Sequence, residues 1–170
     1  MRVPMDLIVA VNEDWGIGKD GTQSIVIRED RKRFREITGG GAVIVGRRTL
    51  GDFPNGKPLK NRLNIVLTHS QEPVEGACTA GSVREVQNLL LASGTEKAFV
   101  CGGASVYEQF LPWCRYAYVT KIFACPSSDR FLEDLDASPD WVLREQSEKK
   151  EQDGVTYAFL QYENIRNQER

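Results

Sequence analysis

Short apolar segments recur along the chain, and each has the length of one β-strand. Nearly continuous apolar runs cover residues 7–11, 42–45, 64–67 and 98–101, and residues 116–122 form a fifth segment of this kind. Such runs are typical of strands that are buried on both faces of a parallel sheet. Helical periodicity separates several of them, so the pattern predicts alternating strands and helices.

Three helices are predicted between the strands. Residues 29–38 place apolar side chains on one face at helical spacing. Residues 82–85 (Ser-Val-Arg-Glu) have the form of a capping box, which opens an amphipathic helix. A third, short helix follows Gly103.

The C-terminal part of the chain has a different pattern. Residues 141–146 and 155–162 flank Gln152-Asp153-Gly154, which predicts an antiparallel hairpin with a longish loop. The predicted fold class is therefore α/β, as a single domain over residues 1–170. Its central sheet is mostly parallel, with the antiparallel C-terminal hairpin at one edge and helices on the flanks.

The composition agrees with this fold and limits the partners. The 170 residues are 41% hydrophobic and 27% charged, with a formal net charge of -2. This balance argues against nucleic acid or a membrane surface as the main partner, and no apolar run could span a bilayer. Because no secretory signal is recognisable, we expect a cytoplasmic protein. For a chain of this length we expect a monomer. With four widely spaced cysteines and one histidine, we expect thiols and no metal site.

Two glycine-containing turns follow predicted strands directly. Gly46-Arg47-Arg48-Thr49 comes after the strand at 42–45, and Gly102-Gly103-Ala104-Ser105 comes after the strand at 98–101. Ligands of such sheets bind beyond the carboxyl ends of the strands, where helix starts offer free amides to phosphate. The pair predicts a long, phosphate-bearing ligand such as a dinucleotide. The alternative is that both turns are plain connectors.

A third glycine cluster, residues 16–21, has the GxGxxG pattern without the context that the pattern requires. A dinucleotide fingerprint needs a tight strand-to-helix turn. Here the first glycine lies beyond the end of the strand, and residues 22–27 alternate like a strand. The cluster is therefore interpreted as a loop, either a mobile one over a site or a plain surface loop.

Asp30 is the carboxylate with the strongest indication of a chemical role. It shares the apolar face of its helix with Ile27 and Phe34, and a buried carboxylate is costly without a partner. The alternative is an acidic residue that interacts with the helix dipole. Arg62 could bind a substrate carboxylate or lie on the surface, and His69 could meet a phosphate or be an exposed loop residue.

Taken in order, these motifs resemble the dihydrofolate reductase family over essentially the whole chain. The matching segments are residues 8–12, 15–21, 29–34, 43–49, 56–67 and 101–112, together with the terminal hairpin. The resemblance implies a dihydrofolate-reductase-like fold, with an adenosine-binding subdomain at about residues 41–95 inserted in the loop subdomain. It also implies an NADPH-dependent oxidoreductase of one-carbon metabolism that forms tetrahydrofolate and is a target of antifolates.

The resemblance further implies roles for individual residues. Asp30 would hold the pterin ring and assist protonation of its N5, Arg62 would pair with the glutamate carboxylate of dihydrofolate, and residues 13–26 would close over the nicotinamide. The residues implied to contact dihydrofolate are Ile8, Val9, Asp30, Arg31, Phe34, Phe53, Leu59, Arg62, Cys101, Tyr107 and Thr120. Those implied to bind NADPH are Ala10, Ile17, Gly18, Gly46, Arg47, Arg48, Thr49, Leu67, Thr68, His69, Gly102, Gly103, Ala104, Ser105, Val106 and Tyr107.

Three departures from the family pattern lie on the folate side. Gln23-Ser24-Ile25 replaces an apolar segment that usually contains an aromatic residue, Arg28 stands where proline is common, and Arg31 stands where an apolar residue usually touches the substrate. They bear on substrate affinity, rate and antifolate sensitivity. Two other functions fit part of the pattern. One is a catalytically weakened paralogue that binds NADPH or folate, and the other is a pyrimidine reductase of riboflavin synthesis, which should lack Asp30 and Arg62.

Overall fold

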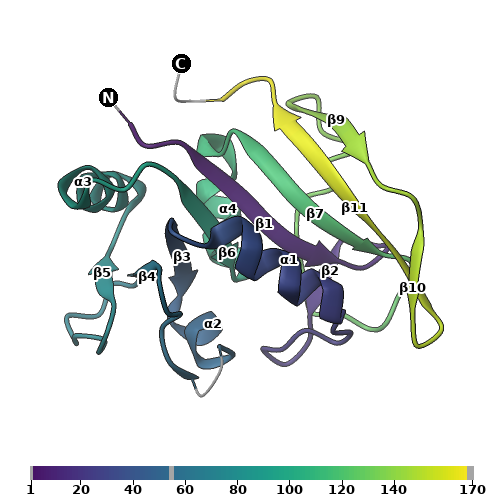
Figure 1. Cartoon of the computed structure of the whole chain (residues 1–170), viewed down its shortest axis with the longest axis horizontal. Coiled ribbons are helices and arrows are strands. Elements are labelled where there is room, and N and C mark those ends of the chain that lie inside the picture. Colours follow the sequence, from purple (N-terminus) through teal and green to yellow (C-terminus); the bar gives the residue numbers. More distant parts are fainter. Residues whose placement is uncertain (1, 54–55, 168–170) are drawn as a thin grey trace.

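A large sheet forms the centre of the molecule in the computed structural model, which describes residues 2–53 and 56–167 (Figure 1). Its strands are β1 (Met5–Val11), β3 (Ala42–Gly46), β4 (Leu63–Leu67), β5 (Cys78–Ala80), β6 (Ala98–Gly102), β7 (Tyr116–Ile122), β9 (Trp141–Gln146), β10 (Lys150–Gln152) and β11 (Val155–Asn164). They lie in the order β10-β11-β7-β1-β6-β3-β4-β5, and β9 also pairs with β11. A separate small sheet pairs β2 (Gly16–Gly18) with β8 (Arg130–Phe131).

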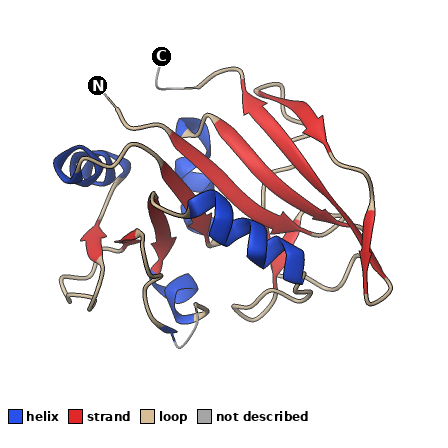
Figure 2. Ribbon diagram, viewed as in Figure 1, coloured by secondary structure: helices blue, strands red, loops and turns tan. Residues whose placement is uncertain are grey.

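Helices cover both faces of the large sheet. They are α1 (Arg28–Thr38), α2 (Arg47–Gly51), α3 (Val83–Ser93), α4 (Ala104–Phe110) and a 3-10 turn, η2 (Leu111–Trp113). Figure 2 shows α1 crossing the near face, with α4 behind the strands. The largest apolar cluster joins Leu7, Val9 and Val11 of β1 to side chains of α3 and α4. A smaller cluster on the other face contains Ile27, and burial of these apolar surfaces holds the layers together.

The five predicted strands are confirmed, and β1 lies between β6 and β7, parallel to both. The α/β class and the antiparallel edge are also confirmed, because β11 runs antiparallel to β7. The predicted capping box opens α3, where Ser82 Oγ accepts a hydrogen bond from Glu85 N at 3.1 Å. Within the described ranges, no helix is long and apolar enough to cross a membrane.

The predicted longish loop of the C-terminal hairpin is wrong. Asp153 and Gly154 form a two-residue turn with φ values of 50° and 80°, and Gln152 pairs directly with Val155 across it. Asp-Gly is the preferred sequence for such a turn, because both central residues need a positive φ. β9 pairs with residues 160–164 of β11, and the register shifts between Gln161 and Tyr162.

The glycine cluster at 16–21 ends in a tight turn, and the residues directly after it do not form a helix. β2 ends at Gly18, and a tight turn with Asp20 and Gly21 at positive φ brings Lys19 opposite Thr22. The rejection of a dinucleotide fingerprint is therefore confirmed. The first half of the cluster is nonetheless strand β2 rather than open loop, because β8 supplies a partner that lies far away in the sequence.

Candidate active site

The first turn of α1 places Asp30 against the middle of the sheet. The helix starts after Ile27, whose buried side chain fixes the approach of the chain. On the facing strand, β7, the hydroxyl of Thr120 donates a hydrogen bond to Asp30 Oδ1 at 2.5 Å. The inward orientation that the helical spacing predicted for Asp30 is thus confirmed.

The surroundings of Asp30 favour its protonated form more than water does. Burial raises the pKa of its carboxyl, and the Thr120 hydrogen bond and the charges of Arg33 and Arg31 oppose this shift in part. Arg33 is held beside the acid by stacking, with its guanidinium 4.4 Å from the ring centroid of Phe159. A carboxyl with a raised pKa is suited to proton exchange closer to neutral pH.

The backbone of β1 lies next to this acid. Ala10 pairs with Thr120 in the parallel ladder, and the carbonyl of Ile8 accepts a hydrogen bond from the Tyr107 hydroxyl at 2.8 Å. Burial raises the pKa of Tyr107 well above its ordinary value, so the phenol keeps its proton and remains a donor. The side chain of Val9 belongs to the opposite core, so only its backbone faces this side of the sheet.

The two glycine turns, predicted separately, lie against each other. Val45 pairs with Gly102 across β3 and β6, which brings the starts of α2 and α4 together. A Cβ atom on Gly46 would lie 3.2 Å from Val106 Cγ2, and one on Gly103 would lie 3.2 Å from Thr49 Oγ1. The glycines therefore let the two turns pack closely, which brings two helix starts together, and free amides at helix starts suit a pyrophosphate.

Arg62 is fixed beside the C-terminal end of α1. Its guanidinium donates to Thr38 Oγ1 (2.8 Å), to the Arg35 carbonyl (3.0 Å) and to the Lys60 carbonyl (2.7 Å). These bonds use three of the five N–H groups of an arginine. One N–H on each terminal nitrogen is left for a ligand, and arginine can bind a carboxylate through two such groups.

Asn64 is a positioning residue that the sequence interpretation missed. Its side chain accepts from Leu59 N at 2.9 Å and donates to the carbonyls of Leu59 (2.8 Å) and Arg62 (3.0 Å). The loop that precedes β4 is therefore held by the strand itself. A single polar residue within the apolar run 64–67 was the available signal, because buried polar groups need partners.

Other predicted residues lie several strands away from Asp30 in the same sheet. Thr68 and the exposed His69 follow β4, which is separated from β7 by β1, β6 and β3. That separation corresponds to about 19 Å at normal strand spacing, so only an elongated ligand could contact both ends. Phe53 and Cys101 lie between them, packed against the cluster that contains Val45.

The segment before α1 carries an unpaired polar group. The Nε2 atom of Gln23 is buried and has no hydrogen-bond acceptor in the part of the chain that the structure describes. Ile25 packs against the cluster of Ile27, whereas Arg31 is exposed. The departures noted in the sequence therefore gather around one wall of the site, beside Asp30.

Comparisons with known proteins agree with this arrangement. The family model described as "Dihydrofolate reductase" matches residues 4–164. The dihydrofolate reductase of Bacillus subtilis is 36% identical over 162 residues, which is 94% of each chain, and that of Rattus norvegicus is 34% identical over 181 residues, covering 94% of this chain and 97% of its own. The structure of Enterococcus faecalis dihydrofolate reductase complexed with NADP(H) and RAB-propyl superimposes with a TM-score of 0.83 at 26% identity, over 96% of this chain and 99% of that one. The chain belongs to the dihydrofolate reductase family.

Proposed function

We propose that Asp30 is the acid of the reaction that this chain catalyses, the NADPH-dependent reduction of 7,8-dihydrofolate to 5,6,7,8-tetrahydrofolate. The observation that carries the proposal is the partly buried hydrogen bond from Thr120 to Asp30 on the substrate side of the sheet. NADPH supplies the hydride that is added to C6 of the pterin, and N5 must receive a proton. The protein must therefore orient the pterin and deliver that proton.

Asp30 is suited to both tasks. Oδ1 is held by Thr120, whereas Oδ2 makes no hydrogen bond to any residue of the described ranges and can accept one from an N–H group of the pterin. This fixes the orientation of the ring, which is the proximity contribution to the rate. Burial raises the pKa of the carboxyl, so it can hold a proton for transfer to N5, which we propose passes through a water molecule.

The rest of the substrate would extend along α1 toward Arg62. The two remaining N–H groups of Arg62 would bind the glutamate carboxylate. Phe34, Phe53 and Leu59 would line the apolar middle of the pocket, and each is partly buried in the structure.

The cofactor would lie across the cradle formed by the turns after β3 and β6. Gly46, Gly102 and the helix starts beside them would hold the pyrophosphate. Arg47, Arg48 and His69, all exposed, would face the adenosine end, where a 2′-phosphate distinguishes NADPH. This supports an adenosine-binding subdomain at about residues 41–95, with Ala10, Ile17 and Gly18 toward the nicotinamide.

We also propose that the chain is a cytoplasmic protein. Among the described residues no disulfide links the four cysteines, which supports a reducing compartment such as the cytoplasm. We expect a monomer, which light scattering on the purified protein would test.

The deciding experiment is an assay with NADPH and dihydrofolate, run beside the variant Asp30→Asn. Rapid consumption by the wild type, strongly reduced in the variant near neutral pH, would support the proposal. If no turnover occurs although NADPH still quenches tryptophan fluorescence, the function proposed here fails. The chain would then be a binding paralogue, with Gln23-Ser24-Ile25 as the first segment to restore.

A further inference from the structure

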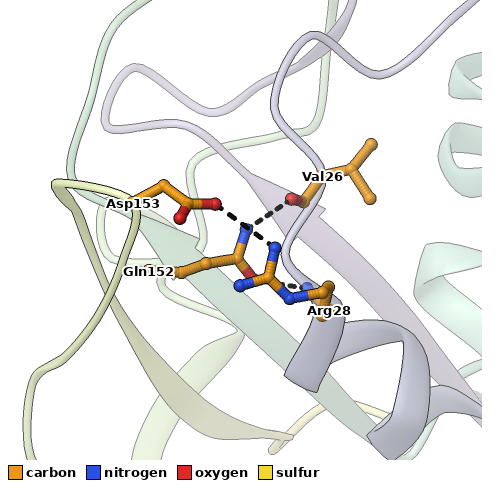
Figure 3. Close-up of polar contacts among 4 residues, drawn as sticks. All are labelled: Val26, Arg28, Gln152 and Asp153. Atoms are coloured by element: carbon orange, nitrogen blue, oxygen red, sulfur yellow. Dashed lines mark hydrogen bonds and ion pairs between the residues drawn. The ribbon is translucent and has the colours of Figure 1, made fainter.

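The first turn of α1 is capped from the other end of the chain. Its N-cap residue, Ile27, provides no side-chain hydrogen bond, although the first amides of a helix need external acceptors. Gln152 on β10 supplies one. Its Oε1 accepts from Arg28 N at 2.7 Å, and its Nε2 donates to the carbonyl of Val26 at 3.0 Å (Figure 3).

Further contacts join the same hairpin to the same turn. Figure 3 shows the Arg28 guanidinium reaching Asp153, an ion pair of 3.2 Å whose side chains are each 74% exposed. Glu29 accepts a hydrogen bond from Tyr157 at 3.2 Å and lies 3.7 Å from Lys150 Nζ. Exposed ion pairs contribute little free energy. The carboxamide of Gln152 differs from these contacts because it satisfies two backbone groups of the turn at once.

The hairpin that carries Gln152 belongs to the same part of the sheet as Thr120. A tight Asp153–Gly154 turn joins β10 to β11, and Phe159 of β11 pairs directly with Thr120 of β7. Gln152 thus holds the backbone just before Asp30, while Thr120 holds its carboxyl. Both anchors stand on one continuous hydrogen-bonded sheet, which is a rigid support.

We propose that Gln152 is a positioning residue for Asp30, one that fixes the first turn of α1 so that the carboxyl stays aligned with Thr120 and the pterin. The inference rests on the function proposed above. It depends on Arg28, because the proline that is common at this position in the family would offer no N–H to Gln152.

Two variants remove the link in different ways. Gln152→Ala deletes both hydrogen bonds of the carboxamide, whereas Arg28→Pro deletes the N–H that donates to Oε1 and leaves the bond to the Val26 carbonyl. Proline is well tolerated at the first helical position, and Ile27 already has the extended conformation that proline requires before it (φ -102°, ψ 120°). Arg28→Pro should therefore fold as well as the wild type. Glu151→Ala, at an exposed neighbouring position on β10, is the matched control.

The expected result is a split between substrate and cofactor. In Gln152→Ala and in Arg28→Pro, the KM for dihydrofolate rises by about tenfold, while the Kd for NADPH and the Tm change little. The double variant shows no larger rise than Gln152→Ala alone, since that variant already lacks both hydrogen bonds of the carboxamide. Glu151→Ala behaves like the wild type. If Gln152 only stabilised the fold, its loss would reduce the fraction of active enzyme. The apparent kcat would then fall, and the KM for dihydrofolate would stay unchanged.

Hydrogen exchange separates this inference from the proposed function. In Gln152→Ala, the amides of Arg28 and Arg31 should exchange about tenfold faster than in Glu151→Ala, whether or not the protein turns over dihydrofolate. An inactive wild type with this difference would overturn the proposed reaction and leave the cap standing. An active wild type with unchanged KM in both variants, or equal exchange in Gln152→Ala and Glu151→Ala, would overturn the role of Gln152.

Discussion

The two turns that follow β3 and β6 contact each other directly, whereas the wall that carries Asp30 is held by residues distant in the sequence. A Cβ atom on Gly46 would lie 3.8 Å from Gly103 N, because adjacent strands bring both turns to one point. Asp30 instead depends on Thr120 and Gln152, which lie on other elements. One half of the site is thus encoded in short motifs, and the other in long-range packing.

This difference explains where the chain departs from its family. A turn that leaves little room for a Cβ atom tolerates few residues, which fits the resemblance of these glycine motifs to the family pattern. The wall beside Asp30 that carries Gln23, Ile25, Arg28 and Arg31, called the folate wall below, can change when a compensating contact exists elsewhere. Arg28 in place of proline comes with an amide that Gln152 accepts from. Experiments that perturb one half and leave the other intact test whether the two halves are separable.

The largest expected effect is on the folate wall. Asp30→Asn should lower kcat/KM for dihydrofolate at pH 7 by about 10²- to 10⁴-fold, because the amide cannot hold the proton for N5. Binding of NADPH, followed by tryptophan fluorescence, should change little. An equal loss of NADPH affinity would show that a change at Asp30 also disturbs the cofactor half of the site.

The same variant tests the environment of Asp30 through stability. Burial raises the pKa of this carboxyl in the folded state, so its contribution is fully present below the unfolded pKa and is lost as the pH rises through the folded pKa. Asparagine does not titrate. The Tm of Asp30→Asn should therefore exceed that of the wild type at pH 8, and the gap should narrow toward pH 4. A gap that does not depend on pH would contradict the raised pKa.

Arg62 should give the next largest effect. In Arg62→Gln the KM for dihydrofolate should rise by about tenfold to a hundredfold, because a charged hydrogen-bond donor to the glutamate carboxylate is lost. The informative control is a dihydropterin substrate without the glutamate tail. Its KM should be the same in the variant and the wild type, and a parallel rise for both substrates would assign Arg62 to holding α1 instead.

Gly46 sharpens the comparison from the cofactor side. In Gly46→Ala the new methyl group would lie 3.2 Å from Val106 Cγ2, so Val106 at the start of α4 must give way slightly and the Kd for NADPH should rise by about fivefold. Gly46 has an ordinary φ of -78°, so backbone strain does not contribute. Adding Val106→Ala removes the clash and should restore part of the affinity. Titration of NADPH in the absence of folate measures this effect alone.

The sequence predicted the parts of the fold and site that depend on local patterns. The buried strands, the capping box at Ser82 and the inward face of Asp30 all follow from the spacing of apolar residues. β2 and β10 did not follow, since each is too short to be recognised without its partner strand. The roles of Asn64 and Gln152 were missed for the same reason, because a polar side chain shows its partners only after distant segments meet.

The smallest expected effect concerns Gln23. Its buried Nε2 has no acceptor among the described residues, and an unsatisfied buried donor costs about 1–3 kcal/mol. Gln23→Leu should therefore stabilise the ligand-free protein by about 1 kcal/mol, a rise in Tm of about 2–4 °C for a chain of this size. The matched control is Gln87→Leu, because the carboxamide of Gln87 is fully paired with Val3, at 2.8 and 3.0 Å. The same substitution there should lower the Tm. If both variants are destabilised alike, the Gln23 carboxamide has a hydrogen-bond partner in the ligand-free protein. The polar residue Gln23 is then compensated by a contact elsewhere, as the change at Arg28 is by Gln152.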